Sequence, residues 1–189
     1  MKRIAVVLFV SGLVASVTLA SDTYKLDPAH TSIGFTITHL VISEVEGRFN
    51  DVAGEVTVED GAVTGTKATI QAKSVDTKIE KRDNHLRSPD FFDVEKYPTI
   101  TFESTKVEKE ADKTFITGKF TMHGVTKEIR FPFVAKGPIK DPWGNTRIGL
   151  VAETSLNRTE YGMKSFPGVG DEAKIKLSAE AVKEQPGKK

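Results

Sequence analysis

Eight runs of the chain between residues 33 and 181 alternate apolar and polar side chains with a period of two. Successive side chains of a β-strand point to opposite faces, so this alternation predicts eight strands with one dry face each. The last run, residues 173–181, is rich in Ala, Lys and Glu, which also suit a helix, but its five alternate small or apolar positions favour a strand. The small or apolar positions are Ile33, Phe35 and Ile37; Val56 and Val58; Ala68, Ile70 and Ala72; Ile100 and Phe102; Ile116, Gly118, Phe120 and Met122; Ile129, Phe131 and Phe133; Ile148, Leu150 and Ala152; and Ala173, Ile175, Leu177 and Ala179.

Short turns join several of these runs. Asp60-Gly61 separates the second run from the third, and His123-Gly124 separates the fifth from the sixth. Such pairs are typical of tight hairpins, and strands joined by tight hairpins are antiparallel. Eight antiparallel strands with one dry face each either close into a barrel or pack as a sandwich.

One segment, residues 77–93, breaks the strand pattern. Thr77 and Glu80 have the spacing of a capping box, in which the two side chains satisfy free amides at the start of a helix. Ile79 and Leu86 then fit helical spacing, and Ser88-Pro89 ends the helix because proline disfavours a helical residue before it. We therefore expect a helical insert between the third and fourth strands, crossing or covering one end of the sheet.

The N-terminal 20 residues have the three parts of a secretory signal peptide. Lys2 and Arg3 give a positive start, residues 4–17 are uncharged and mostly apolar, and Ala20 ends a run of small residues that suits a signal peptidase. A membrane anchor needs about 20 apolar residues, which this run does not provide. We predict cleavage between Ala20 and Ser21, export to the periplasm, a single domain over residues 21–183 and a flexible tail over residues 184–189.

Composition narrows the classes of function. Without Lys2 and Arg3, the mature chain has 25 basic and 26 acidic residues, a net charge of −1 that gives no basic face of the kind nucleic-acid-binding proteins use. The chain contains no Cys, so disulfides, thiolate metal sites and a cysteine nucleophile are absent from its chemistry. Beyond the signal peptide, no stretch is apolar enough to predict a stable membrane span.

Residue types that often carry catalysis or bind metals do not form a recognisable site. The four histidines, His30, His39, His85 and His123, lack the local spacing of zinc ligands, so we predict no metal site. We expect His85 to make a local hydrogen bond that ties the insert to the barrel. Asp83, Asp90 and Asp93 lie beside Arg82 and Arg87, where ion pairs and helix caps explain them better than paired catalytic carboxylates. Ser32 near His30 has no third orienting group, so it does not indicate a nucleophile.

Several blocks of the chain, in order along its whole mature length, have distinctive sequences. They are residues 82–93 (RDNHLRSPDFFD), 96–102 (KYPTITF), 24–27, 30–32, 38–40, 47–49, 117–118 and 123–127 (HGVTK). These blocks resemble the YceI-like family. The resemblance implies a lipocalin-like, eight-stranded antiparallel barrel, secretion to the periplasm, and binding of a long apolar ligand such as a polyisoprenoid or a fatty-acid-like amide.

The residues alone leave two interpretations of the barrel interior open. A barrel of eight strands can be filled by side chains or can hold one small ligand. The small inward residues, Ala68, Ala72, Gly118, Ala152, Ala173 and Ala179, leave volume unfilled if they face a cavity. The same residues are equally expected where the helix packs closely or the barrel tapers.

With the family resemblance, we predict a non-enzymatic periplasmic protein that carries, stores or sequesters a long-chain isoprenoid or fatty-acid-like lipid, without a cofactor. Each buried methylene contributes about 0.8 kcal/mol, so a long tail gives affinity before any polar contact. The alternatives are an enzyme acting on such a lipid, or a filled barrel that binds a protein partner; a homodimer is compatible with the sequence. The residues expected to line the apolar tunnel are Ile33, Phe35, Ile37, Ile70, Ile100, Phe102, Phe120, Phe131, Phe133, Leu150, Ala152 and Leu177.

Overall fold

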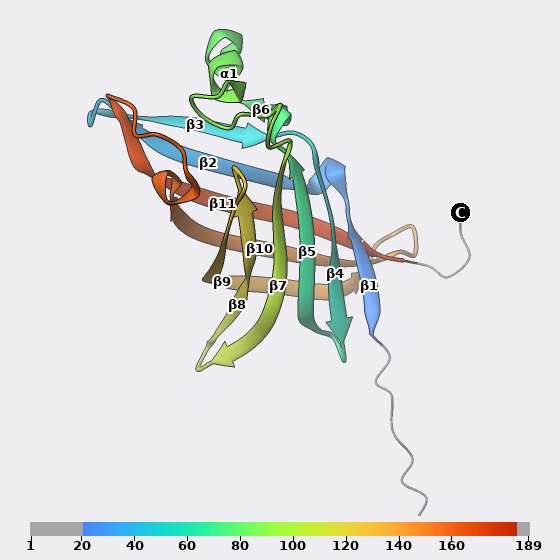
Figure 1. Ribbon diagram of the computed structural model, residues 1–189. Helices are drawn as coiled ribbons and strands as arrows, with labels where there is room; N and C mark the ends of the chain where they lie inside the picture. The colour runs from blue at the N-terminus through green and yellow to red at the C-terminus, as the bar shows by residue number, and fades with distance from the viewer. Residues whose placement is uncertain (1–20, 185–189) are drawn as a thin grey trace, which may run out of the picture.

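The computed structural model describes residues 21–184, which form an all-β, closed antiparallel barrel of eight strands with one short α-helix (Figure 1). Hydrogen bonding runs around the ring in the order β1-β4-β5-β7-β8-β9-β10-β11 and closes between β11 and β1. The eight-stranded antiparallel barrel predicted from the sequence is therefore confirmed. Its strands are β1 (Asp22–Leu26), β4 (Val52–Glu59), β5 (Ala62–Gln71), β7 (Thr99–Glu110), β8 (Lys113–Met122), β9 (Val125–Lys140), β10 (Thr146–Asn157) and β11 (Val169–Lys183).

Three further strands extend the ring at one end: β2 (Ser32–His39), β3 (Ser43–Phe49) and β6 (Val75–Asp76). A short 3-10 helix, η1 (Pro28–His30), separates β1 from β2, and both strands pair with β11, so they are two halves of one broken barrel strand. β3 pairs with β2, and β4 pairs with β1. β3 and β4 are therefore also two halves of one broken strand. The periodicity did not predict β1 or β3, because each short strand has only two large buried or half-buried apolar side chains among polar ones.

The predicted helical insert is present, but its start was predicted wrongly. Helix α1 (Glu80–Arg87) follows Ile79, whose side chain makes no capping hydrogen bond. Lys78 has a positive φ of 63°, which turns the chain between Thr77 and the helix. The amide of Thr77 therefore donates to Asp83 Oδ1 at 2.8 Å, and its hydroxyl also bonds to that carboxylate, so Thr77 holds α1 from the side instead of capping it.

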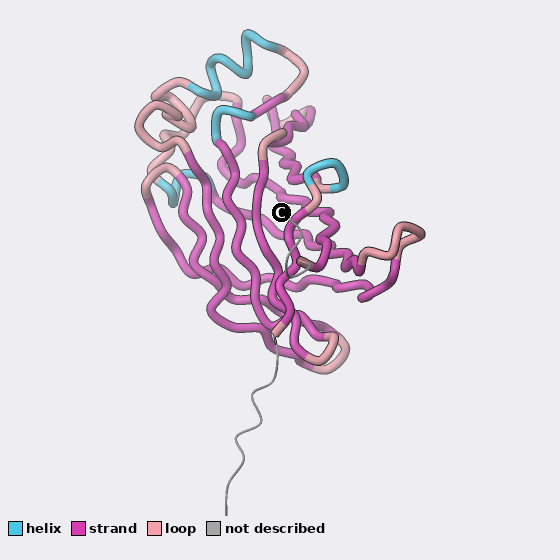
Figure 2. The backbone as a smooth tube through the Cα atoms, turned by 90° about the vertical axis from the view of Figure 1, so that its right-hand side faces the viewer, coloured by secondary structure: helices cyan, strands magenta, loops and turns pink. Residues whose placement is uncertain are grey.

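The other features of the insert follow the sequence more closely. The helix ends at Arg87, with Ser88 as its C-cap before Pro89. His85 Nε2 lies 3.0 Å from Asp90 Oδ2, a hydrogen bond within the insert, and its ring packs 5.6 Å from that of Phe166 in the loop after β10. The α1 segment lies above one rim of the strands in both views (Figures 1 and 2).

The opposite end of the barrel is filled by regular strand side chains. Tyr24 and Ile148 are buried there, and both belong to one apolar cluster whose members come from β1, β4, β5, β8, β9, β10 and β11. Residues 1–20, which include the predicted signal peptide and Ala20, and residues 185–189 of the predicted tail lie outside the described residues. Within residues 21–184, no helix is long and apolar enough to cross a membrane. The fully buried members of the cluster at this end are Tyr24, Val56, Val58, Ile148 and Ala181.

Candidate functional site

The barrel encloses a cavity of about 220 Å³ whose wall is almost entirely carbon. The side chains that form it come from the inward faces of the strands, from Leu86 of α1, and from loop residues Phe91, Phe92 and Met163. Such a wall favours an apolar ligand, because a polar ligand would bury groups that find no hydrogen-bond partner there. The wall includes all twelve residues that parity assigned to the interior: Ile33, Phe35, Ile37, Ile70, Ile100, Phe102, Phe120, Phe131, Phe133, Leu150, Ala152 and Leu177.

Five of the six small residues expected to face inward divide into two groups. The sixth, Ala72, lies in a short 3-10 helix after β5, where it is buried but does not line the cavity. Ala68, Ala152, Ala173 and Ala179 are in the cavity wall, where their short side chains leave space. Gly118 has a different role, since a Cβ at this position would lie 2.6 Å from Cζ of Phe102. The glycine thus provides room for a ring that lies across its strand. Of the two interpretations left open by the sequence, the alanines of the wall fit the cavity, and Gly118 fits close packing.

Strand parity missed the part of the wall that comes from irregular segments. Phe49 ends β3, and its ring lies 5.5 Å from that of Phe92 and 5.8 Å from that of Phe35. Leu86 and Phe92 belong to the insert, and Leu26 belongs to the unpredicted strand β1. The Phe91-Phe92 pair between Pro89 and the fourth run was the available sequence signal, since two adjacent aromatic residues in a polar insert are rarely both exposed.

Among residues 21–184, the polar side chains that reach the wall are four threonines, Thr31, Thr66, Thr101 and Thr154, and one arginine, Arg158. Arg158 is buried, and burial lowers the pKa of its guanidinium, with the nearby Asp171 acting against that shift. Its Nε donates to the carbonyl of Gly170 at 2.9 Å, and its Nη2 donates to Asp171 Oδ1 at 2.9 Å. Its Nη1 also donates to the carbonyl of Lys164 at 2.5 Å. Arg158 therefore ties the loop over residues 162–168 to the start of β11 and positions that loop.

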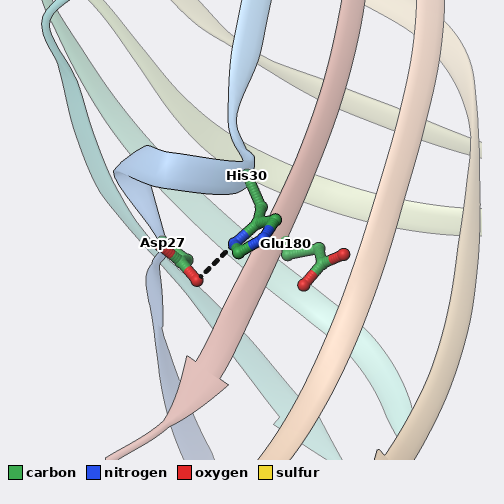
Figure 3. Close-up of side chains that lie close together, drawn as sticks. All are labelled: Asp27, His30 and Glu180. Atoms are coloured by element: carbon green, nitrogen blue, oxygen red, sulfur yellow. Dashed lines mark hydrogen bonds and ion pairs between the residues drawn. The ribbon is translucent and has the colours of Figure 1, made fainter.

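A group of possible metal ligands lies outside the cavity. Asp27, His30 and Glu180 place one ligand atom each within 4.8 Å of the others (Figure 3). However, Arg147 Nη1 donates to Asp27 Oδ2 at 2.8 Å and to Glu180 Oε2 at 3.2 Å. The guanidinium already supplies the positive charge that a cation would bring, so this group is an ion-pair network that joins the ends of β1, β10 and β11.

The network also includes Asp141, whose Oδ2 accepts from Arg147 Nε at 2.8 Å. Hydrogen bonds from Arg147 and then His30 lower the pKa of Asp27 to about 2. Hydrogen bonds from Arg147 and then Asn145 lower the pKa of Asp141 to about 2 as well, against the effect of burial. Both carboxylates are therefore charged throughout the physiological range.

This barrel matches a known family along nearly its whole described length. A model of the YceI-like domain matches residues 24–181, from β1 to β11. The chain belongs to the YceI-like family. Among relatives of this YceI-like protein, a UPF0312 protein of Pseudomonas paraeruginosa is 40% identical over 171 residues, covering 88% of this chain and 89% of that protein. A UPF0312 protein of Photorhabdus laumondii is 39% identical over 176 residues, covering 90% and 91%.

Solved structures share the same architecture. The Campylobacter jejuni YceI protein superposes with a TM-score of 0.70 at 30% identity, covering 76% of this chain and 88% of that one. Burkholderia cenocepacia BcnA gives a TM-score of 0.73 at 20% identity, covering 82% and 99%. A polyisoprenoid binding domain from Saccharophagus degradans gives 0.69 at 15% identity, covering 88% and 100%. The last two are distant enough in sequence to show the fold alone.

Proposed function

We propose that this YceI-like protein binds one long-chain amphiphile, an isoprenoid or a fatty-acid-like lipid, inside its barrel and carries or sequesters it in the periplasm. The observation that supports this most directly is the carbon-lined cavity, which runs from Leu86 of α1 to Leu150 and Ala179 in the barrel. Binding then depends on burying methylene groups, at about 0.8 kcal/mol each, without any strong polar contact from the wall.

The family and one structural neighbour support the ligand class. The Saccharophagus degradans domain with this fold is described as polyisoprenoid binding, and we extend that chemistry to the present cavity. The signal-peptide pattern of residues 1–20 supports the periplasmic location.

Binding is favoured over catalysis by the chemistry of the wall. Acid–base or nucleophilic catalysis requires paired polar groups within hydrogen-bond reach of the substrate. Arg158 is the charged group that lines the cavity among residues 21–184, and its hydrogen bonds go to the loop and to the start of β11. The cavity also supports binding over a filled barrel that acts only through its outer surface.

The proposal is tested by native mass spectrometry of the protein isolated from the periplasmic fraction of its own host. The wild type should carry one lipid per chain, and its intact mass should correspond to a chain that begins at Ser21. Ala152→Trp fills the cavity, since Ala152 lies in the wall between Phe133 and Leu177 on the neighbouring strands. We expect this variant to fold and to lose the lipid.

A matched control places the same side chain outside the barrel. Val134 lies on β9 beside Phe133 but is 56% exposed, so Val134→Trp should retain the lipid. The proposal fails if the wild type carries no lipid and takes none from membranes, while Ala152→Trp is destabilised by about 1–3 kcal/mol, as expected for overpacking of a filled core.

A further inference from the structure

Three consecutive apolar side chains protrude from the turn between β2 and β3. Leu40 is 55% exposed, Val41 is 92% exposed and Ile42 is 86% exposed. We call these three residues the hairpin tip. In Figure 1 it is the turn at the left, where the blue β2 ribbon meets the cyan β3 ribbon. Single exposed apolar residues are ordinary on protein surfaces, but three in a row at a convex turn are not explained by packing.

The backbone of the hairpin tip makes this choice of residues more unusual. Leu40 has a φ of 51° and Val41 a φ of 65°, and the amide of Ile42 donates to the carbonyl of His39 at 3.2 Å. A turn with two central residues of positive φ strongly favours Asn-Gly, and a β-branched residue is a rare choice there. Leu40 is partly covered by Gly168, where a Cβ would lie 2.7 Å from Leu40 Cδ2, but Val41 and Ile42 are almost fully exposed. The fold thus gains no favourable backbone conformation from Leu40 and Val41, and almost no burial from Val41.

The hairpin tip is connected to the cavity by a short chain of contacts. The amide of Leu40 donates to the carbonyl of Gly168 at 2.7 Å, which fixes the tip against the loop over residues 162–168. Phe166 of that loop is exposed, and its ring lies 5.5 Å from the ring of Phe91, which lines the cavity. Ile37, three residues before Leu40, also lines the cavity.

The size and shape of the hairpin tip favour a lipid bilayer over a protein partner. Full burial of three aliphatic side chains removes roughly 180–360 Å² of apolar surface from water. A stable protein interface buries about 800 Å² on each partner. The hairpin tip is too narrow to bury that much area against a second copy of the chain or against another protein. It can instead insert between the head groups of a bilayer.

We propose that the hairpin tip inserts into the surface of a lipid bilayer and holds the α1 end of the barrel against it, with Phe166 and Phe91 next to the membrane. The nearest acidic side chain after the tip, Glu44, is already paired with Lys174 Nζ at 2.8 Å. Insertion is therefore driven by the apolar side chains, and it does not depend on anionic lipid.

The role of docking, which is to bring the cavity to its lipid, rests on the proposed function, whereas docking itself does not. Binding to vesicles is measurable without any cavity ligand, and ligand binding is measurable without vesicles. A dilute, monomeric fluorescent fatty acid reports on the cavity alone. If the wild type binds vesicles but not the fluorescent fatty acid, the proposed function is contradicted. If it binds the fatty acid but not vesicles, docking is contradicted.

The experiment is flotation of the mature protein with phosphatidylcholine vesicles at low and high salt. The test variant is Leu40→Asn combined with Val41→Gly, which suits the positive φ angles and should leave the fold at least as stable. We expect its partition into vesicles to fall by about tenfold or more, with unchanged affinity for the fluorescent fatty acid. Salt should change the partition of the wild type little.

The matched control is Trp143→Ser, because Trp143 is 80% exposed in the loop between β9 and β10, on the other side of the molecule from the hairpin tip in Figure 1. This variant should float like the wild type. Docking through the tip is overturned if the double variant floats as well as the wild type, if Trp143→Ser loses flotation instead, or if binding requires anionic lipid and disappears in salt. It is also overturned if the double variant changes the sedimentation velocity without vesicles, since the tip would then join two copies of the chain.

Discussion

The two ends of the barrel are built in different ways. Away from α1, regular strands meet around Tyr24 and Ile148, whose side chains are almost fully buried. At the α1 end, irregular segments complete the wall with Leu86 and Phe92, which are only half-buried. A second buried cluster, which includes Val75 and Tyr161, lies near α1, so packing at both ends contributes to stability. The end away from α1 is closed by regular strands, whereas the segments that complete the wall at the α1 end are looser and adapted to admit a ligand.

The largest expected effect separates the two ends by stability. Ile148→Ala removes buried methyl groups from the closed end and should lower the free energy of unfolding by about 2–5 kcal/mol. Ile37→Ala, in the cavity wall near the α1 end, should cost about 1–2 kcal/mol, because Ile37 is half-buried and already faces a void. Urea denaturation measures both, and equal losses would remove the distinction.

A smaller effect is expected where the insert is fixed to the barrel. Thr77→Val keeps the shape of the side chain but leaves buried Asp83 without one donor and Arg82 Nε without its acceptor at 2.7 Å. The free energy of unfolding should fall by about 1–3 kcal/mol, and a bound lipid should dissociate faster because α1 is loosened. Stopped-flow release of a fluorescent fatty acid measures the second effect.

The control for that variant is Thr121→Val, which removes a hydroxyl from the exposed pair of Thr121 and Thr126 on β8 and β9. It should change neither stability nor release by a measurable amount. If both threonine variants behave alike, the buried bonds of Thr77 do not govern access to the cavity.

The smallest expected effect is a dependence of the free energy of unfolding on acidic pH. It arises from the ion pairs of Asp27 with Arg147 and His30, on the outer surface of the closed end. The pKa of Asp27 is lowered from 3.8 to about 2 in the folded state, so the unfolded chain binds more protons at acidic pH. The stability that Asp27 contributes is fully present above about pH 5 and is lost as the pH falls through 4 toward 2. Asp27→Asn should flatten this part of the curve of urea midpoint against pH, and an unchanged slope would show that the network does not stabilise the fold.

The sequence predicted the barrel and its inward face because both depend on a local, period-two signal. Phe102 and Phe131 alternate with polar neighbours in their strands, and the structure places their rings 5.5 Å apart on the cavity wall. The segments that are not regular carried no such signal. The helix start was mispredicted because a capping box was assumed, whereas the positive φ of Lys78 and the distant partner Asp83 decide the geometry.

Whether the barrel was hollow was also beyond the sequence. Ala152 and Gly118 are both small residues at inward positions, yet one leaves space in the wall and the other accommodates the Phe102 ring. That difference depends on where rings from neighbouring strands lie, which no single run of the chain encodes.

Closure of the ring has a consequence for how the chain reaches its folded state. β1 pairs with the end of β11, where Tyr24 lies opposite Lys183. The first strand of the ring to be synthesised can therefore complete its pairing only after the last strand has been made. Contacts between such distant residues slow folding, because a long loop must be ordered before the contact forms. Until β11 is made, β1 and β10 each present an unpaired edge that can join another chain. A truncation before Val169 is therefore expected to leave an aggregation-prone open sheet instead of a smaller barrel.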